Sequence, residues 1–242
     1  MRELDWDGSR NIRDLGGLAT PLSPTGRTVR GRVARGPRRE LLTSAAWDTA
    51  DRWGLRSVVD LRSADEVGSR TGDPDAPPPE RLSIVLAPTE DQTDAEFRAV
   101  CMPILDSPEY WRYNVRILPA LVRGALTAVA EAEPGILVHC AAGRDRTGMV
   151  SAVLLANAGV RPEEVVADYA VSVRAMAGHG AHGGPTADRQ AAWTPAQVSA
   201  WLDEVEPHVR TFASDIDGVL DELEVNREVR ARLRALLTDP EL

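Results

Sequence analysis

The sequence has few cysteines, no long apolar run and no surplus of positive charge. Its 242 residues include only Cys101 and Cys140, which are too few for a disulfide framework. The longest apolar run, residues 149–160, is well short of the roughly 20 residues that a membrane-spanning helix needs. A net charge of -9, with acidic residues spread along the chain, argues against a nucleic-acid-binding or membrane-binding surface. We therefore expect a soluble protein with no nucleic-acid partner and no membrane span.

The first residues also lack the features of a secretory signal. The start MRELDWDGSR has no apolar h-region, which together with the scarcity of cysteine favours the reducing cytoplasm. Export without a signal peptide stays open as an alternative. His179 and His182 form a His-x-x-His pair, but no nearby Cys or acidic cluster completes a metal-ligand set. We predict no metal site and no cofactor.

Short apolar runs alternate with helical spacings along most of the chain. Runs with the length and composition of strands occupy residues 28–36, 55–61, 81–87 and 135–140. The last three have the pattern of buried strands. Helical spacing occupies residues 41–54, 107–133 and 147–159, and Pro119 and Gly124 predict a kink or two consecutive helices in the longest of these segments. The alternation predicts an α/β fold with a central, mostly parallel sheet flanked by helices.

We expect a single domain over residues 1–242. The hydrophobic content of 43% is enough to bury one sizeable core. The C-terminal part, residues 161–242, adds three helical segments at 161–173, 194–209 and 226–237. The segment 91–118, between a strand and the long helical region, is the expected lid over the functional site.

The most informative stretch is HCAAGRDRTG, residues 139–148, between an apolar strand and a helix. In an open α/β sheet, ligands bind where strands end and the following helices begin. The N-terminus of that helix offers unpaired N–H groups and the positive end of its dipole to an anion. Gly143 can turn successive N–H groups inward, and Arg146 supplies a planar fork for two phosphate oxygens. The stretch is predicted to hold a tetrahedral phosphate.

The same surroundings give the cysteine of this stretch a chemical role. Thiols near helix N-termini and cations ionise at roughly pH 3.5 to 7.5 instead of about 8.5, so we expect Cys140 to be a nucleophile at neutral pH. His139 is expected to fix the loop by hydrogen bonds, and the Thr147 hydroxyl to stabilise the departing thiolate. The expected phosphate-binding residues are Ala141, Ala142, Gly143, Arg144, Thr147 and Gly148. In the alternative interpretation Cys140 is a buried small hydrophobe, which leaves the Arg-Asp-Arg run at 144–146 unexplained.

This stretch resembles the His-Cys, five residues, Arg, Ser/Thr loop of cysteine-dependent protein tyrosine phosphatases. Two further motifs, NIRDLGG at 11–17 and VVDLRS at 58–63 followed by Glu66, are similar to the paired N-terminal motifs of the bacterial tyrosine/lipid phosphatase family, the atypical dual- or triple-specificity type. The resemblance extends to ARLRALL at 231–237. It implies a protein tyrosine phosphatase-like fold and hydrolysis of phosphotyrosine, with phosphoserine, phosphothreonine and phosphoinositides as further substrates of some members.

Three positions depart from the family pattern. Arg144 replaces the usual Lys of the loop but keeps its charge. Ala141 stands where lipid-type loops often carry an additional Lys, which weakens the case for phosphoinositides. The third departure is at residues 32–41, RVARGPRREL, where the family tends to have an Arg-Ser step before a helix. The resemblance therefore does not predict the shape of this part of the pocket rim.

The resemblance also implies roles for residues outside the cysteine and arginine. A general acid must protonate the leaving oxygen, and no Trp-Pro-Asp tripeptide occurs in the chain to supply one. The resemblance favours Asp145 inside the loop, for which a salt bridge to a neighbouring arginine is the alternative role. Asp106 is the rival acid, because it lies 34 positions before Cys140, about where dual-specificity phosphatases place theirs.

The N-terminal motifs are expected to supply supporting residues. The resemblance implies that Asn11, Arg13 and Asp14 pack near the active loop. The alternative is a tight turn in which Arg13 pairs with a carboxylate, and it is favoured more for Asp14 than for Arg13. Asp60 and Arg62 end a predicted strand. They are expected either to reach the pocket rim or to form an ion pair that braces the sheet.

The leading interpretation is a phosphatase that hydrolyses phosphate monoesters through a cysteinyl-phosphate intermediate. Its partner would be a phosphorylated protein. The enzymatic alternative is the same chemistry on a soluble small molecule, such as an inositol phosphate or a phosphorylated metabolite. A sulfurtransferase of the rhodanese type is a further alternative, but the Arg-Thr-Gly ending of the loop suits a phosphatase better. The non-enzymatic alternative is a catalytically dead phosphate-binding module, against which the presence of Cys140, Arg146 and Asp145 argues.

Overall fold

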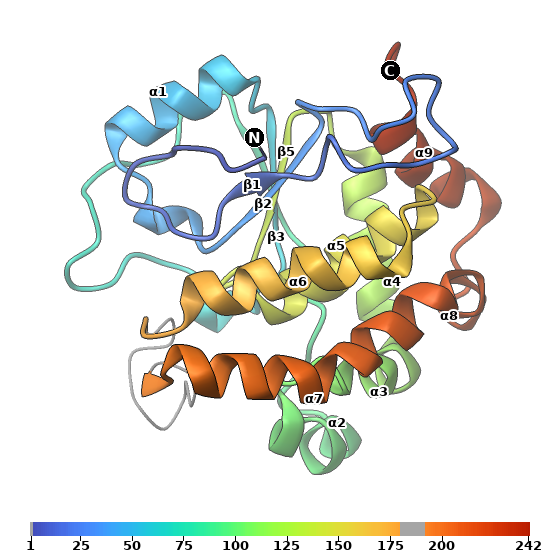
Figure 1. Cartoon of the computed structure of the whole chain (residues 1–242). Helices are drawn as coiled ribbons and strands as arrows, with labels where there is room; N and C mark the ends of the chain where they lie inside the picture. Colours follow the sequence, from blue (N-terminus) through green and yellow to red (C-terminus); the bar gives the residue numbers. More distant parts are fainter. Residues whose placement is uncertain (1, 180–191) are drawn as a thin grey trace.

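The computed structural model describes residues 2–179 and 192–242. Within these residues a five-stranded sheet lies between helices (Figure 1), with the strand order β1-β2-β5-β3-β4. The strands are β1 (Arg13–Asp14), β2 (Val33–Gly36), β3 (Ser57–Asp60), β4 (Ser83–Leu86) and β5 (Ile136–His139). β1 is antiparallel to β2, and the other neighbouring strands are parallel. The predicted α/β class with a mostly parallel sheet is confirmed.

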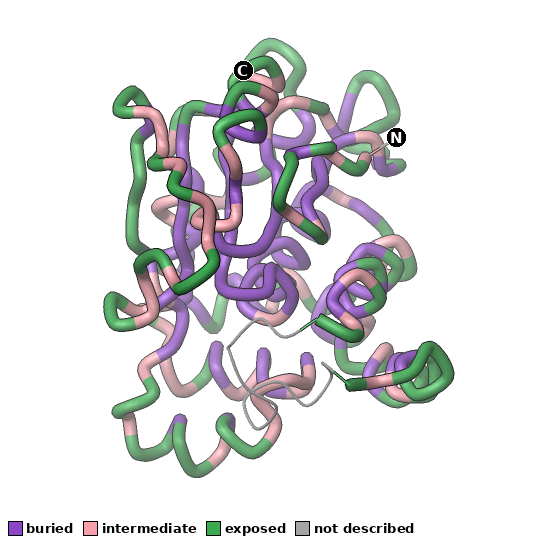
Figure 2. The backbone as a smooth tube through the Cα atoms, turned by 90° about the vertical axis from the view of Figure 1, so that its left-hand side faces the viewer, coloured by how far each residue is buried: buried purple, intermediate pink, exposed green. Residues whose placement is uncertain are grey.

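Alternating side chains of the strands fill two separate cores, one on each face of the sheet. On β3, Val58 packs in the core that contains Trp47 of α1 (Ser44–Trp53), and Val59 packs in the larger core on the other face. On β5, Leu137 belongs to the first core and Val138 to the second. Successive residues of a strand point to opposite faces, and both faces are covered here, so these strands are apolar throughout. Figure 2 shows the buried residues gathered in the middle of the molecule.

The larger core is covered by a group of helices around α5 (Asp145–Asn157). α5 is buried from Arg146 to Asn157, because β2 and β5 contact it from the sheet side and other helices contact it from outside. The surrounding helices are α3 (Tyr110–Ile117), α4 (Pro119–Glu131), α6 (Pro162–Met176), α7 (Pro195–Ser214), α8 (Ile216–Glu222) and α9 (Arg227–Thr238). A helix buried on all sides is held rigidly, so its first turn is a fixed platform for the preceding loop.

The long helical region and the C-terminal tail fold largely as the sequence predicts. Residues 107–133 form two consecutive helices, and Pro119 occupies the first turn of α4, where its missing N–H is tolerated. The tail contains α6, α7 and α9 at the predicted places, plus α8, which the sequence analysis does not include. α8 is only 7 residues long, and it is separated from α7 by the non-helical backbone of Asp215.

The strand β4 corrects one expectation. The run 81–87 has the composition of a buried strand, but residues Ser83 to Leu86 are all exposed. β4 pairs with β3 alone and forms an edge of the sheet. Only the flanking residues Leu82 and Ala87 are buried, at 8% exposure each. The apolar composition therefore reports strand propensity here and not burial.

The segment expected to form a lid contains α2 (Ala95–Val100), a short 3-10 helix (Met102–Ile104) and α3. Its second half is anchored, because Trp111 of α3 packs edge-on against Tyr169 of α6 and Phe212 of α7. Phe97 of α2 is fully buried as well. A lid that opens remains a prediction.

Among the described helices, none combines the length and the apolar character that a membrane crossing requires. The described residues also hold no group of three or more His, Cys, Asp or Glu side chains arranged to bind a metal. His182 of the His-x-x-His pair lies outside the described residues.

Candidate active site

The site is assembled at the C-terminal ends of three parallel strands. The register places Gly36 at the end of β2 beside His139 at the end of β5, and His139 beside Asp60 at the end of β3. The segments that follow these residues are far apart in sequence but start side by side at one edge of the sheet. The middle segment is the loop 140–144, which leads directly into α5.

The carbonyl groups of residues 140 to 143 all accept hydrogen bonds from groups outside this loop. His139 Nδ1 donates to the carbonyl of residue 140 (3.1 Å), and the Arg38 amide donates to that of residue 141 (3.0 Å). Asn11 Nδ2 donates to the carbonyls of residues 142 and 143 (3.1 Å each), and Arg35 Nη2 also donates to that of residue 143 (2.6 Å). In a trans peptide the N–H points away from the C=O of the same unit. The amides of residues 141 to 144 are therefore turned toward the inside of the loop, where they form a cradle for an anion.

Two glycines make this tight arrangement possible. Gly143 has a φ of +68°, and a β-carbon there would lie 2.4 Å from the backbone of Gly36. Any other side chain would push the loop off β2. Gly148, in the first turn of α5, lies against Trp111 and Tyr169, to which an added β-carbon would approach within 3.0 and 3.1 Å. Both glycines fix the position of the loop relative to the core.

The two residues expected to carry the chemistry lie on either side of the helix start. Cys140 is 2% exposed and Arg146 is 6% exposed, so both side chains are buried. The Thr147 hydroxyl is buried and has no hydrogen-bond partner among the described residues. A buried hydroxyl without a partner is unusual, so the Thr147 hydroxyl is available for a further hydrogen bond.

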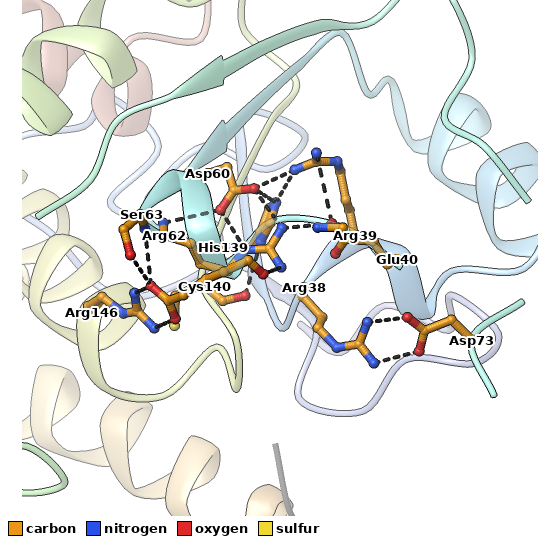
Figure 3. Close-up of polar contacts among 12 residues, drawn as sticks. Arg38, Arg39, Glu40, Asp60, Arg62, Ser63, Asp73, His139, Cys140 and Arg146 are labelled. Atoms are coloured by element: carbon orange, nitrogen blue, oxygen red, sulfur yellow. Dashed lines mark hydrogen bonds and ion pairs between the residues drawn. The ribbon is translucent and has the colours of Figure 1, made fainter. Parts of the chain in front are cut away.

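Arg146 is held by a carboxylate from the segment after β3. Its Nη1 and Nη2 donate to Glu66 Oε2 and Oε1 at 2.5 and 2.7 Å (Figure 3). Burial alone would raise the pKa of Glu66, but the hydrogen bonds and charge of Arg146 outweigh it and lower the pKa to about 2. Ser63 also donates to Glu66 Oε2, through both its amide and its hydroxyl. This bidentate pair aims the guanidinium fork that a phosphate would need.

A second carboxyl group, that of Glu90, faces the same guanidinium. Glu90 is buried, and its Oε2 lies 3.8 Å from Arg146 Nε. Burial raises the pKa of Glu90, and the charge of Arg146 opposes this only in part. Glu90 is therefore a second carboxyl group beside the Arg146 guanidinium, and the sequence does not predict it.

Asp60 and Arg62 form a buried ion pair at the end of β3. Arg62 donates to Asp60 from Nε at 2.9 Å and from Nη2 at 2.7 Å, and Nη2 also reaches Glu40 at 2.8 Å. Burial would raise the pKa of Asp60, but Arg62 lowers it to about 2. Arg39 is a further ion-pair partner of Asp60 (Figure 3). The geometry matches the interpretation in which Asp60 and Arg62 brace the sheet.

His139 connects this ion pair to the loop. Its ring is completely buried, with Nδ1 on the Cys140 carbonyl and Nε2 3.6 Å from Asp60 Oδ2. Because a carbonyl can only accept, Nδ1 carries the proton. Burial lowers the pKa of His139 to about 4, against the opposing effect of Asp60. A neutral His139 therefore holds the carbonyl of the expected nucleophile.

A second ion cluster supports the loop from behind. Arg13 donates to Asp168 of α6 from Nε at 2.9 Å and from Nη2 at 2.8 Å, and Arg35 Nη1 reaches the same carboxylate at 2.8 Å. All three residues are at most 2% exposed. Arg13 Nη1 also donates to Asn11 Oδ1 at 2.8 Å, which orients the amide that holds the loop carbonyls. Arg13 thus acts on the loop through Asn11.

Electrostatics inside this cluster are balanced by one carboxylate. Burial alone would raise the pKa of Asp168, but Arg13 and Arg35 outweigh it and hold the pKa well below its usual range. Burial and the neighbouring charge of Arg13 lower the pKa of Arg35 to about 10. Asp168 is therefore an anion shared by two buried guanidinium groups.

Asp14 has a different place from its neighbour Arg13. Its carboxylate accepts from the amides of Gly16 at 2.7 Å and Gly31 at 2.8 Å, and from Trp53 Nε1 at 3.1 Å. These bonds hold the turn after β1. Asp14 is a turn residue, which is the alternative that the sequence favours for it.

The two candidate acids are both near α6. Asp145 accepts from Arg144 Nε at 3.0 Å, the salt bridge that the sequence allows as its alternative role. The pKa of the Tyr169 hydroxyl is raised well above its usual value, chiefly by burial. The charges of Asp145 and of Asp106, which is half-buried in the expected lid, raise this pKa further. The chain contains no lysine at all. The presence of arginine at position 144, where the family usually has lysine, is therefore not a change peculiar to this loop.

Sequence reasoning misses four residues that shape the site. Glu66 is noted only as part of a motif, and Glu90, Arg35 and Asp168 are not singled out. A signal exists for Asp168, because it is an isolated carboxylate among apolar residues of a helix, and a buried acid needs a cationic partner. Arg35 gives a similar signal, because it is a charged residue in a strand whose residues are all buried. No local signal identifies Glu90.

Comparisons with known proteins agree with this geometry. Residues 4–239 match the model of the tyrosine phosphatase family. A Cupriavidus necator protein whose name proposes a tyrosine-protein phosphatase is 33% identical over 177 residues, which cover 69% of this chain and 62% of that protein. The triple specificity protein phosphatase PtpB of Mycobacterium tuberculosis is 31% identical over 197 residues, 70% of this chain and 68% of PtpB. A tyrosine-protein phosphatase of Nostoc commune is 30% identical over 146 residues, which cover 57% of this chain and 47% of that protein.

Proposed function

Because the chain belongs to the tyrosine phosphatase family, we propose that it is a cysteine-dependent phosphatase that hydrolyses phosphate monoesters, with phosphotyrosyl proteins as substrates. The observation that carries this proposal is the loop 140–144, whose four outward-held carbonyls turn the amides inward beside Cys140 and Arg146. The similarity to a triple specificity phosphatase supports phosphoserine and phosphothreonine as further substrates.

The proposed reaction has two steps. Cys140 Sγ attacks phosphorus while the bond to the ester oxygen breaks, and a general acid gives its proton to that oxygen. The Arg146 fork and the amides of residues 141 to 144 stabilise the three remaining phosphate oxygens. Water then loses a proton to the former acid and attacks phosphorus, the sulfur–phosphorus bond breaks, and inorganic phosphate leaves. The Thr147 hydroxyl stabilises the thiolate that departs.

Hydrolysis of p-nitrophenyl phosphate in the presence of a chelator tests the proposal. We expect turnover that vanadate inhibits, because vanadate occupies the same oxyanion cradle. Cys140→Ser should abolish turnover while phosphate binding stays measurable by calorimetry. Activity that survives in Cys140→Ser, or activity that the chelator removes, would overturn the proposed mechanism.

The general acid is proposed to be Asp145. Asp145→Asn should lose most of its rate on alkyl phosphates, whose leaving oxygen needs protonation, and less on the activated aryl ester. Asp106→Asn and Glu90→Gln are the matched comparisons, since each removes one carboxylate and keeps the shape. A selective loss on alkyl phosphates in either of these two variants, with Asp145→Asn unaffected, would transfer the role to that residue.

A further inference from the structure

One buried carboxyl group beside the phosphate loop has no role in the proposed reaction. Glu90 is 7% exposed, and its Oε2 lies 3.8 Å from Nε of Arg146. That separation is longer than a hydrogen bond, whereas the carboxylate of Glu66 accepts from both Nη groups of the same guanidinium. Glu90 and Arg146 therefore interact through charge, and Glu66 is the carboxylate that holds the arginine in place.

The side of the guanidinium that Glu90 approaches is the side that an oxyanion needs. An arginine has five N–H donors, and Glu66 uses one from each Nη group of Arg146. The Nε N–H and the remaining N–H of an Nη group form a second fork, and Nε is the atom that approaches Glu90 Oε2. An oxyanion that binds to this second fork brings its negative charge next to Glu90.

The backbone that carries Glu90 is anchored to the sheet and to α3. Glu90 follows β4, where the amide of Ala87 donates to the carbonyl of Asp60 at 2.8 Å. Thr89 is fully buried, and its carbonyl accepts from Asn114 Nδ2 of α3 at 3.0 Å. These two anchors hold the carboxyl group of Glu90 at the site. A negative ligand therefore meets a carboxyl group that stays close to it.

The groups that face Glu90 come from three other parts of the chain. Burial raises the pKa of Glu90 most strongly, and the negative charges of Glu66 and of Asp145 on α5 raise it further. Arg146 and the Tyr110 hydroxyl on α3 lower the pKa, but they do not outweigh the other effects. A dianion in the loop 140–144 would add to the negative charge around Glu90, and a nearby like charge favours the protonated form of a carboxyl group.

Two further titratable groups close to Glu90 do not change this balance. Burial and the negative charge of Glu90 raise the pKa of Cys101 to about 11, so this thiol stays neutral. The carboxylate of Asp91 accepts from the amide and the hydroxyl of Thr93, at 2.8 and 2.6 Å. Asp91 is thereby held in its own turn.

We infer that Glu90 takes up one proton from solvent when a dianionic oxyanion binds to the loop 140–144, so that the dianion and the proton bind together. The inference rests on the proposed function, which places the phosphate of the substrate in this loop. Without the proton, the dianion would share Arg146 with two carboxylates. With the proton, the guanidinium is shared between the dianion and Glu66 alone. Glu90 is thus a positioning residue that acts through Arg146 and sets the pH range in which the substrate binds.

Sulfate is the probe for this inference, because it stays a dianion over the whole pH range of the test. Calorimetry of sulfate binding to Cys140→Ser, in two buffers of different ionisation enthalpy, measures the protons taken up for each sulfate bound. The serine removes the ionisation of the thiol from the measurement. Between about pH 6 and pH 8 we expect an uptake that approaches about one proton, with a sulfate affinity that falls by up to about tenfold per pH unit. Absence of uptake throughout this range would overturn the inference.

A substitution at position 90 tests which residue takes up the proton. Glu90→Gln, added to Cys140→Ser, keeps the shape of the side chain but does not titrate. We expect the uptake to disappear and the sulfate affinity to become nearly independent of pH. Glu228→Gln, which removes an exposed carboxylate of α9, is the matched control and should keep the uptake. An uptake that persists in Glu90→Gln would overturn the assignment to Glu90. Thermal unfolding of each variant verifies that it is folded.

Kinetics with the intact nucleophile provide a second readout. The pH dependence of kcat/KM reports ionisations of the free enzyme. The kcat/KM of Glu90→Gln for p-nitrophenyl phosphate, divided by that of the wild type, should therefore rise between about pH 6 and pH 8, by up to about tenfold per pH unit. A ratio that does not change with pH would contradict the inference, since a merely structural role lowers kcat/KM equally at every pH. Absence of hydrolysis in the wild type, with the sulfate-linked uptake intact, would count against the proposed function alone.

Discussion

Two arginine–carboxylate clusters flank the phosphate loop and differ in their access to solvent. Behind the loop, Asp168 binds Arg13 and Arg35, and all three are at most 2% exposed. In front of it, Glu66 binds Arg146 in the same bidentate way, but the Glu66 side chain is 20% exposed. A third arginine, Arg2, donates to Asp168 Oδ1 at 2.6 Å from the outer side of the rear cluster, and its own side chain is 19% exposed. The front cluster has one partner that water and ligands can reach.

The comparison shows how one kind of ion pair serves two purposes. Removing one partner from a fully buried pair leaves an unpaired charge that water cannot reach, so such a pair fixes the fold. A pair open to solvent can exchange its partner at little expense. Arg146 can therefore share its donors between Glu66 and a bound phosphate, whereas Arg13 and Arg35 keep the loop in place throughout.

The largest expected effect comes from removing the charge of the rear cluster. Asp168→Asn should lower the free energy of unfolding by about 3–5 kcal/mol, because two buried guanidinium groups lose their anion. Urea unfolding measures this. Asp217→Asn, which removes an exposed carboxylate of α8, is the matched control and should change stability by about 0.5 kcal/mol or less. If the two variants are equally stable, the rear cluster is not a scaffold.

Replacing the front arginine should affect turnover and leave the fold nearly intact. Arg146→Lys keeps the charge but loses the planar fork, so kcat for p-nitrophenyl phosphate should fall about 10²–10³-fold. The free energy of unfolding should change by about 1 kcal/mol or less, since the lysine keeps a positive charge beside Glu66 and leaves no buried carboxylate unpaired. Steady-state kinetics and urea unfolding on the same preparation test both parts. A variant with wild-type kcat would contradict the role of Arg146.

A smaller effect should appear as a pH dependence of stability. The pKa of His139 is lower in the folded protein, about 4, than its ordinary value of 6.5, so the unfolded chain binds more protons between these values. Stability should therefore fall as the pH falls through this window, by about 2 kcal/mol between pH 7 and pH 5. The carboxylate of Glu66, with a pKa of about 2, contributes only at lower pH.

His139→Asn should remove most of this pH dependence, because the substituted side chain does not titrate. Urea unfolding at pH 7 and pH 5 measures the slope, with the wild type as reference. An unchanged slope in His139→Asn would show that another buried group is responsible.

Much of the fold could be predicted from the sequence, because its signals are local. The apolar run at 135–140 and the helical run that follows both appear at the predicted places as β5 and α5. Pro119 divides the long helical region for a local steric reason. The exposed strand β4 shows the limit: an edge strand and a buried strand have the same composition, and only the pairing of the whole sheet distinguishes them.

The site was predictable where its residues are close in sequence and not where they come from other elements. Cys140, Arg146 and Gly143 belong to one stretch whose spacing is informative by itself. Asp168 reaches Arg13 and Arg35 across more than a hundred residues of chain, so its partner depends on the fold. Asn11 is likewise distant in sequence, and its side-chain amide donates to the carbonyls of residues 142 and 143 across more than a hundred residues of chain.

The four carbonyls held outward from residues 140 to 143 have a thermodynamic consequence. The backbone of the loop is held by hydrogen bonds from the protein itself, so its conformational entropy is lost during folding and not upon association. Small tetrahedral oxyanions can then bind to a preorganised receptor, and whatever binds the native state alone raises its melting temperature. If the proposed function holds, phosphate in a storage buffer should accordingly protect this protein against heat in proportion to the logarithm of its concentration.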